Sequence, residues 1–268
     1  MIPLFKVFVQ DSSIQSIKET LDSGYIGQGP KVDLFEAMLR GHFKTRYLST
    51  VNSCTSAIHL ALHMCGEDES DVISTPLTCT ATNWPILHNR MNIIWADLDP
   101  NTLNIDPEDV ARKITPKTKA IIAVHWGGYP CDLDALKQVV EEAESKPVII
   151  EDCAHCWNSY YKGRQIGTHG NYCCFSFQAI KHLTTGDGGL LITPNKKAWD
   201  RATLLRWYGL DRTSSKDFRC QQDVLEPGFK FHMNDIAASL GIENMFSVDL
   251  NVKKHQNNAK FYRRALRD

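Results

Sequence analysis

Hydrophobic and polar positions follow a repeating pattern along the chain, in which short apolar runs alternate with longer amphipathic segments. The short runs predict strands at residues 47–51, 71–74, 92–96, 120–125, 147–151, 171–177 and 190–193. Apolar residues at helical spacing predict helices at residues 12–23, 32–42, 55–64, 106–113, 132–143, 196–207, 234–246 and 248–268. Short apolar strands separated by helices predict an α/β protein, with a mostly parallel sheet between two layers of helices.

The first two predicted helices are separated by a segment that cannot be helical. In helix 12–23 the apolar residues recur at Ile14, Ile17 and Leu21. In helix 32–42 the residues predicted to face inward are Leu34, Phe35, Met38 and Leu39. Residues 24–30, with the sequence GYIGQGP, contain glycines and a proline at spacings that predict a loop.

Composition excludes several classes of protein. The 268 residues carry 30 Lys+Arg against 31 Asp+Glu, a net charge of −1. A nucleic-acid or anionic-membrane surface needs a basic excess, so neither partner is expected. No apolar run approaches the ~20 residues that span a bilayer, and Pro3 and Lys6 interrupt the N-terminus too early for a signal peptide.

Nine cysteines, an odd number lying mostly in apolar stretches, indicate reduced buried thiols and a cytoplasmic protein. Cys153 and Cys156 form a C-x-x-C pair, which is found in metal and redox sites. A structural zinc would need a second pair at ligand spacing, and Cys173 and Cys174 are adjacent. We therefore expect no metal.

Several segments carry residues suited to chemistry on a phosphorylated cofactor. Strand 147–151 leads into Asp152, at the edge where open α/β sheets place their ligands. Lys181 follows an apolar strand 29 residues later and precedes a glycine-rich turn, a setting that suits a Schiff-base lysine. Thr55 and Ser56 open a helix whose free N–H groups could hold a phosphate. An acid, a lysine and a phosphate cradle together indicate pyridoxal 5′-phosphate chemistry. Taken singly, each also fits a helix cap, a turn residue or a solvated lysine.

The chain resembles the nucleotide-sugar aminotransferases of the DegT/StrS type, which belong to the fold-type I pyridoxal-phosphate enzymes. The resemblance runs from Ile2 to the end, with the motifs in family order. They are residues 23–30, 53–57, 151–155, 175–189 with the block SF-x3-K-x2-TTGDGG, and 228–236.

The resemblance implies a role for individual residues. Lys181 would bind the cofactor covalently and move protons, and Asp152 would pair with the ring nitrogen. Phosphate-binding residues would be Thr55, Ser56 and Ser176, and His155 would lie near the phenolic oxygen of the cofactor. Gly27 and Gln28 lie in the loop that, in the family, approaches the sugar nucleotide.

Some positions depart from the family pattern. Cys54 stands where the family usually has Gly. Cys79 occupies the slot of the aromatic residue that stacks on the cofactor ring, so either Cys79 or the nearby Trp84 covers the ring. Lys230 replaces an Asn that reaches the phosphate of a partner subunit, which implies a homodimer in which Lys230 clamps that phosphate.

We expect residues 1–245 to form the cofactor-binding large domain and residues 246–268 to begin a C-terminal domain that is largely missing. The predicted function is transfer of an amino group from an amino acid, by family habit glutamate, to a nucleotide-linked keto-sugar. Two alternatives are a sugar dehydratase of the same family and a truncated protein that binds the cofactor without turnover. Dehydratases place His where Lys181 stands, which favours transfer.

Overall fold

The computed structural model describes residues 6–66, 68–213 and 221–267, which places Cys220 outside the described residues. A seven-stranded sheet forms its centre, in the order β1-β9-β8-β5-β4-β2-β3. Strand β9 runs antiparallel to both of its neighbours, β1 and β8, and the other neighbouring pairs of this sheet are parallel, so the mostly parallel sheet predicted from the sequence is confirmed. The strands are β1 (Leu48–Val51), β2 (Asp71–Ser74), β3 (Asn92–Trp95), β4 (Thr118–Val124), β5 (Val148–Asp152), β8 (Tyr172–Ser176) and β9 (Gly189–Ile192).

The described α-helices lie close to their predicted positions, with one addition, and a short 3₁₀ helix (Trp126–Gly128) follows β4. They are α1 (Ser13–Ser23), α2 (Pro30–Phe43), α3 (Cys54–Cys65), α4 (Thr80–His88), α5 (Pro107–Lys113), α6 (Leu133–Glu142), α7 (Lys196–Leu205), α8 (Asp235–Met245) and α9 (Val248–Ala265). The sequence did not predict α4, nor the small hairpin of β6 (Tyr160–Tyr161) and β7 (Arg164–Gln165). Helix α2 begins at Pro30, earlier than predicted, because proline fits the first helical position.

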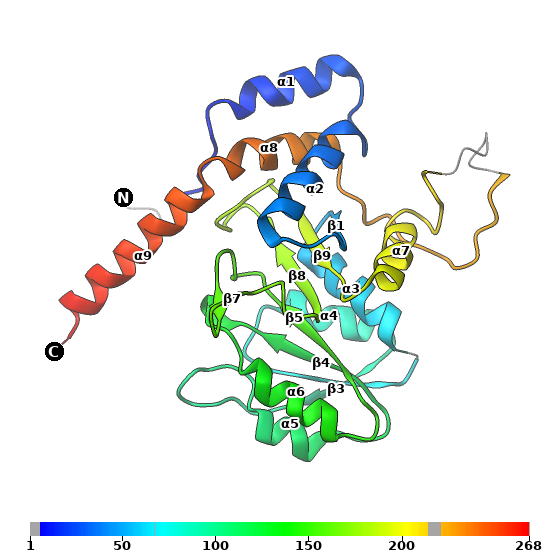
Figure 1. Ribbon diagram of the computed structural model, residues 1–268, viewed down its shortest axis with the longest axis vertical. Coiled ribbons are helices and arrows are strands. Elements are labelled where there is room, and N and C mark those ends of the chain that lie inside the picture. The colour runs from blue at the N-terminus through cyan, green and yellow to red at the C-terminus, as the bar shows by residue number, and fades with distance from the viewer. Residues whose placement is uncertain (1–5, 67, 214–220, 268) are drawn as a thin grey trace.

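Each face of the sheet has its own hydrophobic core. Within β4, Ile121 and Ala123 pack on one side, while Ala120 and Ile122 pack on the other. The first core is completed by α2, α5, α6 and α8, and the second by α3, α4 and α7. The predicted arrangement of a sheet between two helical layers is therefore confirmed (Figure 1).

Helix α1 is oriented opposite to what its hydrophobic pattern suggests. Its buried residues are Ser13, Ser16 and Thr20, and the Thr20 hydroxyl lies 2.6 Å from that of Ser239 in α8. Ile14 is 79% exposed and Leu21 is 52% exposed. Small hydroxyl residues allow α1 and α8 to approach closely, which leaves the apolar side of α1 facing outward.

The inward prediction for α2 is right for most of its residues. Phe35 and Leu39 are fully buried, and Met38 packs partly against the same core. The prediction is wrong for Leu34, which is 49% exposed. Helix α2 packs against α8 and the sheet with one side only. Leu34, which is next to Phe35 in the chain, lies on the side that remains exposed.

Helix α9 extends away from the body of the molecule (Figure 1). Val248 and Val252 are its buried residues, and the rest of the helix is mostly exposed. The proposed division at residue 245 coincides with the end of α8 and stays a prediction. Among the described helices, none combines the length and the apolar character that crossing a membrane requires.

Candidate active site

The residues predicted to bind the cofactor come from elements that end or begin at one edge of the sheet. Asp152 is the last residue of β5, and Ser176 is the last residue of β8. Helix α3 starts three residues after β1 ends, and α4 follows β2. Because the carboxyl ends of parallel strands meet at one edge, this is where an open α/β sheet binds its ligand.

Asp152 is held in a fixed orientation by two hydrogen bonds. The Thr82 hydroxyl donates to Oδ2 at 2.7 Å, and the Ala154 N–H donates to Oδ1 at 3.0 Å. The Cys54 sulfur lies 4.0 Å from Oδ1, and Asp152 itself is 6% exposed. The predicted acid is thus a buried carboxylate with both oxygens engaged. Sequence reasoning missed Thr82, because α4 itself was not predicted.

Lys181 lies in a turn that follows β8. Its N–H donates to the Gln178 carbonyl at 2.9 Å, and the side chain is partly buried. The Phe177 carbonyl accepts both the Thr185 N–H at 2.9 Å and the Thr184 hydroxyl at 3.2 Å. The two threonines of the TTGDGG block therefore close the loop on itself and fix the turn that carries Lys181.

The two glycines that end this block are required by close contacts. A Cβ on Gly189 would lie 2.4 Å from the Ser53 carbonyl carbon and 2.6 Å from the Cys54 nitrogen. A Cβ on Gly188 would lie 2.2 Å from the Thr185 hydroxyl. Glycine at 189 lets the start of β9 approach the first residues of α3, which brings the lysine loop next to the predicted phosphate cradle.

The start of α3 has the form expected of an anion site. The Ser53 side chain caps the helix by accepting the Ser56 N–H at 3.0 Å. The helix offers no partner to the N–H groups of Cys54 and Thr55, which remain available to a ligand. The Ser56 hydroxyl donates to Asn52 at 2.7 Å, so within this chain it supports the cap. Thr55 and Ser176 are both partly exposed at this edge.

The charges of Lys181 and Asp152 influence the pKa values of two nearby residues, His155 and Cys54. Partial desolvation lowers the pKa of His155, the charge of Lys181 lowers it further, and Asp152 opposes both. Burial raises the pKa of Cys54, Asp152 raises it further, and Lys181 opposes them. Since the same two charges act on both residues, the four side chains share one local environment. A carboxylate, a lysine and an anion cradle within it fit pyridoxal 5′-phosphate.

The predicted substrate loop is fixed to α8 by Asp235. The Asp235 carboxylate accepts the N–H groups of Gly29, Lys31 and Val32 at 2.7–3.1 Å, and its own N–H donates to the Gly27 carbonyl at 2.6 Å. The Asp235 side chain therefore accepts the hydrogen bonds of the backbone N–H groups at the start of α2. The Gln28 carbonyl accepts from Arg212 at 2.8 Å. These contacts order Gly27 and Gln28, while their contact with substrate stays a prediction.

Lys230 is exposed and lies beside the β1–α3 connection. The Asn52 amide donates to its carbonyl at 3.3 Å, and the Asn52 N–H donates to the neighbouring Phe231 carbonyl at 2.6 Å. Phe229 and Phe231 stack with ring centroids 4.8 Å apart and pack on His59 of α3. The segment that carries Lys230 is therefore anchored to its own chain, with the side chain of Lys230 directed to the exterior.

Cys79 and Trp84, the two candidates for covering the cofactor ring, are both exposed. Cys79 is the N-cap of α4 and lies three residues before Thr82, so it shares the side of the helix that faces Asp152. Trp84 lies two residues after Thr82 in α4, and residues two apart do not share a face of a helix. The geometry favours Cys79, and the assignment stays a prediction.

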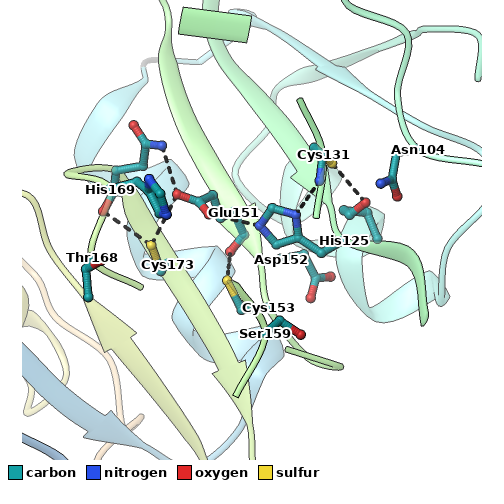
Figure 2. Close-up of polar contacts among 12 residues, drawn as sticks. Asn104, His125, Cys131, Glu151, Asp152, Cys153, Ser159, Thr168, His169 and Cys173 are labelled. Carbon is teal, nitrogen blue, oxygen red and sulfur yellow. Dashed lines mark hydrogen bonds and ion pairs between the residues drawn. The ribbon is translucent and has the colours of Figure 1, made fainter. Parts of the chain in front are cut away.

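A second group of polar residues lies beside Asp152 and is centred on His125 and Glu151 (Figure 2). His125 lies between Glu151 and Cys131, with its Nε2 atom 2.9 Å from a Glu151 oxygen and its Nδ1 atom accepting the Cys131 N–H at 3.0 Å. Burial, the largest single influence, raises the pKa of Glu151, but the hydrogen bond and charge of His125, together with hydrogen bonds from Asn171 and Cys173, bring the pKa below its ordinary value. This pair therefore holds the end of β4 against the end of β5.

The cysteines of the C-x-x-C pair approach this group. The ligand atoms of His125, Cys153 and Cys156 lie within 4.8 Å of one another, as do those of Glu151, Cys153 and Cys173. Both nitrogens of His125 already have partners in the protein. The thiols are almost fully buried, which suits unreactive core cysteines. The expectation that no metal binds here stays a prediction.

Cavity size does not identify the site. A cavity of about 710 Å³ lies between α7 and residues 209–211 and 222–226, and it is lined by residues such as Arg201, Leu204 and Glu226. None of the predicted site residues lines it. The arrangement of donors and charges at the end of β5, rather than the volume of a hollow, locates the candidate site.

Comparison with known proteins decides the family. Residues 9–268 match the model of the DegT/DnrJ/EryC1/StrS aminotransferase family. The chain belongs to this family. Its members depend on pyridoxal 5′-phosphate, so the predicted cofactor and enzyme class are confirmed.

Solved structures support the same fold and cofactor. AtS13 from Actinomadura melliaura is 47% identical with a TM-score of 0.95, over 99% of this chain and 73% of that one. The sugar aminotransferase CalS13 from Micromonospora echinospora is 41% identical with a TM-score of 0.94, over the same shares. The PLP form of the putative sugar aminotransferase Spr1654 from Streptococcus pneumoniae is 29% identical with a TM-score of 0.88, over 97% of this chain and 70% of that one. The predicted fold-type I architecture is thus confirmed.

Proposed function

We propose that this protein transfers an amino group from an amino acid, glutamate, to a keto-sugar attached to a nucleotide. The observation that carries the proposal is the buried Asp152 carboxylate at the end of β5, oriented by Thr82 and Ala154, in one electrostatic environment with Lys181. Bound pyridoxal 5′-phosphate supplies the electron sink for such a transfer.

Lys181 would hold the cofactor and then carry the proton that must move during transfer. Its turn is closed by hydrogen bonds within the TTGDGG loop, so the side chain starts from a fixed base. The presence of lysine at this position, followed by His182, favours transfer over dehydration. The amino group of lysine can both bond to the cofactor and accept a proton, whereas histidine can do only the second.

Asp152 would face the ring nitrogen and His155 the phenolic oxygen. The N–H groups at the start of α3, with Thr55, Ser56 and Ser176, would bind the phosphate. Because Ser56 already donates to Asn52, its contribution would come through its place in the cap. Gly27 and Gln28, ordered by Asp235, would contact the sugar nucleotide.

We also propose that the protein works as a homodimer whose interface includes α1. The exposed apolar residues of α1, Ile14 and Leu21, continue into Tyr25 and Ile26, which are 68% and 50% exposed. Several exposed large apolar residues within one short segment favour burial against another protein surface. A second copy of the chain is the occupant that the family resemblance implies, with Lys230 reaching the phosphate of the partner.

The proposal is tested by turnover with glutamate and a panel of keto-sugar nucleotides, in which 2-oxoglutarate and the amino sugar are measured together. Equal amounts of both products in the parent protein, and neither in Lys181→Ala, are expected. Loss of a sugar hydroxyl without a new amino group would instead identify a dehydratase. Cofactor binding without any product from the panel would identify a non-catalytic protein. Lys117→Ala, which changes an exposed lysine before β4, is the matched control and should retain full turnover.

A further inference from the structure

The residue that orients Asp152 belongs to a chain of two threonine hydroxyls. The Thr82 hydroxyl is 2.7 Å from Asp152 Oδ2, and the Thr78 hydroxyl is 2.7 Å from that of Thr82. Thr82 is 1% exposed and lies in the first turn of α4. Thr78 lies four residues earlier, just before the N-cap of α4, and is partly exposed. The chain therefore runs from the surface to the buried carboxylate.

Hydrogen-bond chemistry fixes the direction of this chain. An ionised carboxylate only accepts hydrogen bonds, so the single proton of the Thr82 hydroxyl must point to Asp152. Between Thr78 and Thr82 either oxygen could be the donor on distance alone. Since the proton of Thr82 is already used, Thr78 must donate to Thr82. Bonds in such a chain polarise one another, so the outer hydroxyl strengthens the inner contact.

The two hydrogen bonds to Asp152 restrict its rotation from opposite sides. Ala154 N–H holds Oδ1 and belongs to the turn after β5, whereas Thr82 holds Oδ2 and belongs to α4. Without Thr82 the carboxylate would keep one backbone anchor and could turn about the Cβ–Cγ bond. A carboxylate that must meet a single ring N–H would then lose its fixed angle, and misplacement of a reacting group lowers rate steeply.

We propose that Thr82 is a positioning residue for the amino-transfer reaction, that it aims Asp152 at the cofactor ring nitrogen, and that Thr78 supports it. This inference rests on the proposed function, because it presumes that Asp152 meets that nitrogen. The inference gives α4 a role in the reaction, in addition to its packing in the second hydrophobic core.

The test compares Thr82→Val, which removes the hydroxyl and keeps the shape, with Thr82→Ser, which keeps the hydroxyl. We expect kcat to fall on the order of 10–100-fold in Thr82→Val, with KM for glutamate nearly unchanged, and to recover in Thr82→Ser. A second readout is the ¹⁵N NMR shift of cofactor labelled at the ring nitrogen, measured in the resting holoenzyme. It should move toward the unprotonated pyridine value in Thr82→Val and stay at the parent value in Thr82→Ser.

A matched control is Thr203→Val, which removes a hydroxyl on α7 that lies 3.2 Å from the Ser49 hydroxyl. It should leave kcat and the ¹⁵N shift unchanged. Thr78→Val should lower kcat less than Thr82→Val does, and it replaces that variant if Thr82→Val does not yield folded protein. Parent-like kcat and ¹⁵N shift in the folded threonine variant would overturn the inference.

Asp152→Asn separates this inference from the proposed function. If Asp152→Asn loses activity while Thr82→Val keeps it, only the positioning role is wrong. If Asp152→Asn itself keeps the parent activity and ¹⁵N shift, the role proposed for Asp152 is wrong, and the inference that depends on it is overturned as well.

Discussion

The edge of the sheet around Asp152 and the outer side of α1 satisfy their side chains in opposite ways. At the sheet edge, polar groups find partners within the chain: Asp152 has Thr82 and Ala154, and Glu151 has His125. On α1, the side that packs on α8 consists of small hydroxyl residues, and the apolar residues are exposed. The carboxylates of the first region have their hydrogen-bond partners within a single chain, whereas the apolar residues of the second have no cover within the described part of the chain.

This difference separates what a single chain can do from what an assembly can do. A carboxylate that is buried and hydrogen-bonded within its own chain keeps its orientation whether or not a partner is present. Exposed apolar residues contribute favourably to the free energy of the protein only when another surface removes them from water. We therefore expect changes at Asp152 to act on the reaction, and changes on α1 to act on association.

The largest expected effect is on the self-contained region. Asp152→Asn should retain the cofactor but lower kcat by more than ~10²-fold, because a neutral amide does not hold the ring nitrogen protonated. Steady-state kinetics with glutamate, alongside the absorbance of the bound cofactor, measures both properties. Near-normal turnover in Asp152→Asn would contradict the role given to this residue.

The second prediction concerns α1. Replacing Ile14 and Leu21 together by Asp should weaken self-association on the order of 10²-fold, because each change places a charge in an apolar contact. Sedimentation velocity over a range of protein concentrations measures the dissociation constant. Gln15→Asp, on the polar side of the same helix, should leave it unchanged. A parent protein that is monomeric at micromolar concentration with full activity would refute the dimer.

The third prediction concerns Lys230, which in the proposed dimer would reach from one chain to the cofactor of the other. Its segment is anchored beside the start of α3. Lys230→Ala should weaken cofactor binding about tenfold, the expected value of one charged hydrogen bond to phosphate. Equilibrium dialysis of the cofactor measures the change, with Lys260→Ala of α9 as the control. If Lys230→Ala binds the cofactor as tightly as the parent, the clamp across the dimer is wrong.

The smallest expected effect concerns the packing beneath Lys230. Burial, and after it the neighbouring His63 and His88, lower the pKa of His59 to about 4. The unfolded chain therefore takes up this proton more readily than the folded protein does, so His59 stabilises the fold above about pH 6.5, and this contribution is lost as pH falls toward 4. His59→Gln should reduce the drop in Tm between pH 7 and pH 5 by about 2–4 °C. Scanning calorimetry at each pH checks this, and an unchanged drop would contradict it.

The sequence predicted the sheet well because buried parallel strands are short, apolar and bounded by polar residues. It missed α4 because the first turn of the helix contains Thr80, Thr82 and Asn83, and its interior contains Pro85, all of which are poor helix formers. Thr82 was missed for a second reason: its contact with Asp152 joins residues 70 positions apart, which no local pattern reveals.

Periodicity predicted the helices of the N-terminal region, but not which side of each helix faces the rest of the protein. The spacing of Ile14 and Leu21 correctly predicted a helix, but the side that meets α8 is set by the hydroxyl residues between them. Leu34 was assigned to the core for the same reason. A hydrophobic pattern shows that a face needs cover, and only the fold shows which surface supplies it.

The most direct measurement of the proposed chemistry is peptide mapping after borohydride reduction of the holoenzyme. Reduction makes the link between the cofactor and its lysine permanent, so mass spectrometry can locate it. We predict one modified lysine per chain, Lys181, and no stoichiometric modification in Lys181→Ala. Full modification of a different lysine, or a parent protein that binds the cofactor without any such link, would contradict the assignment of this site.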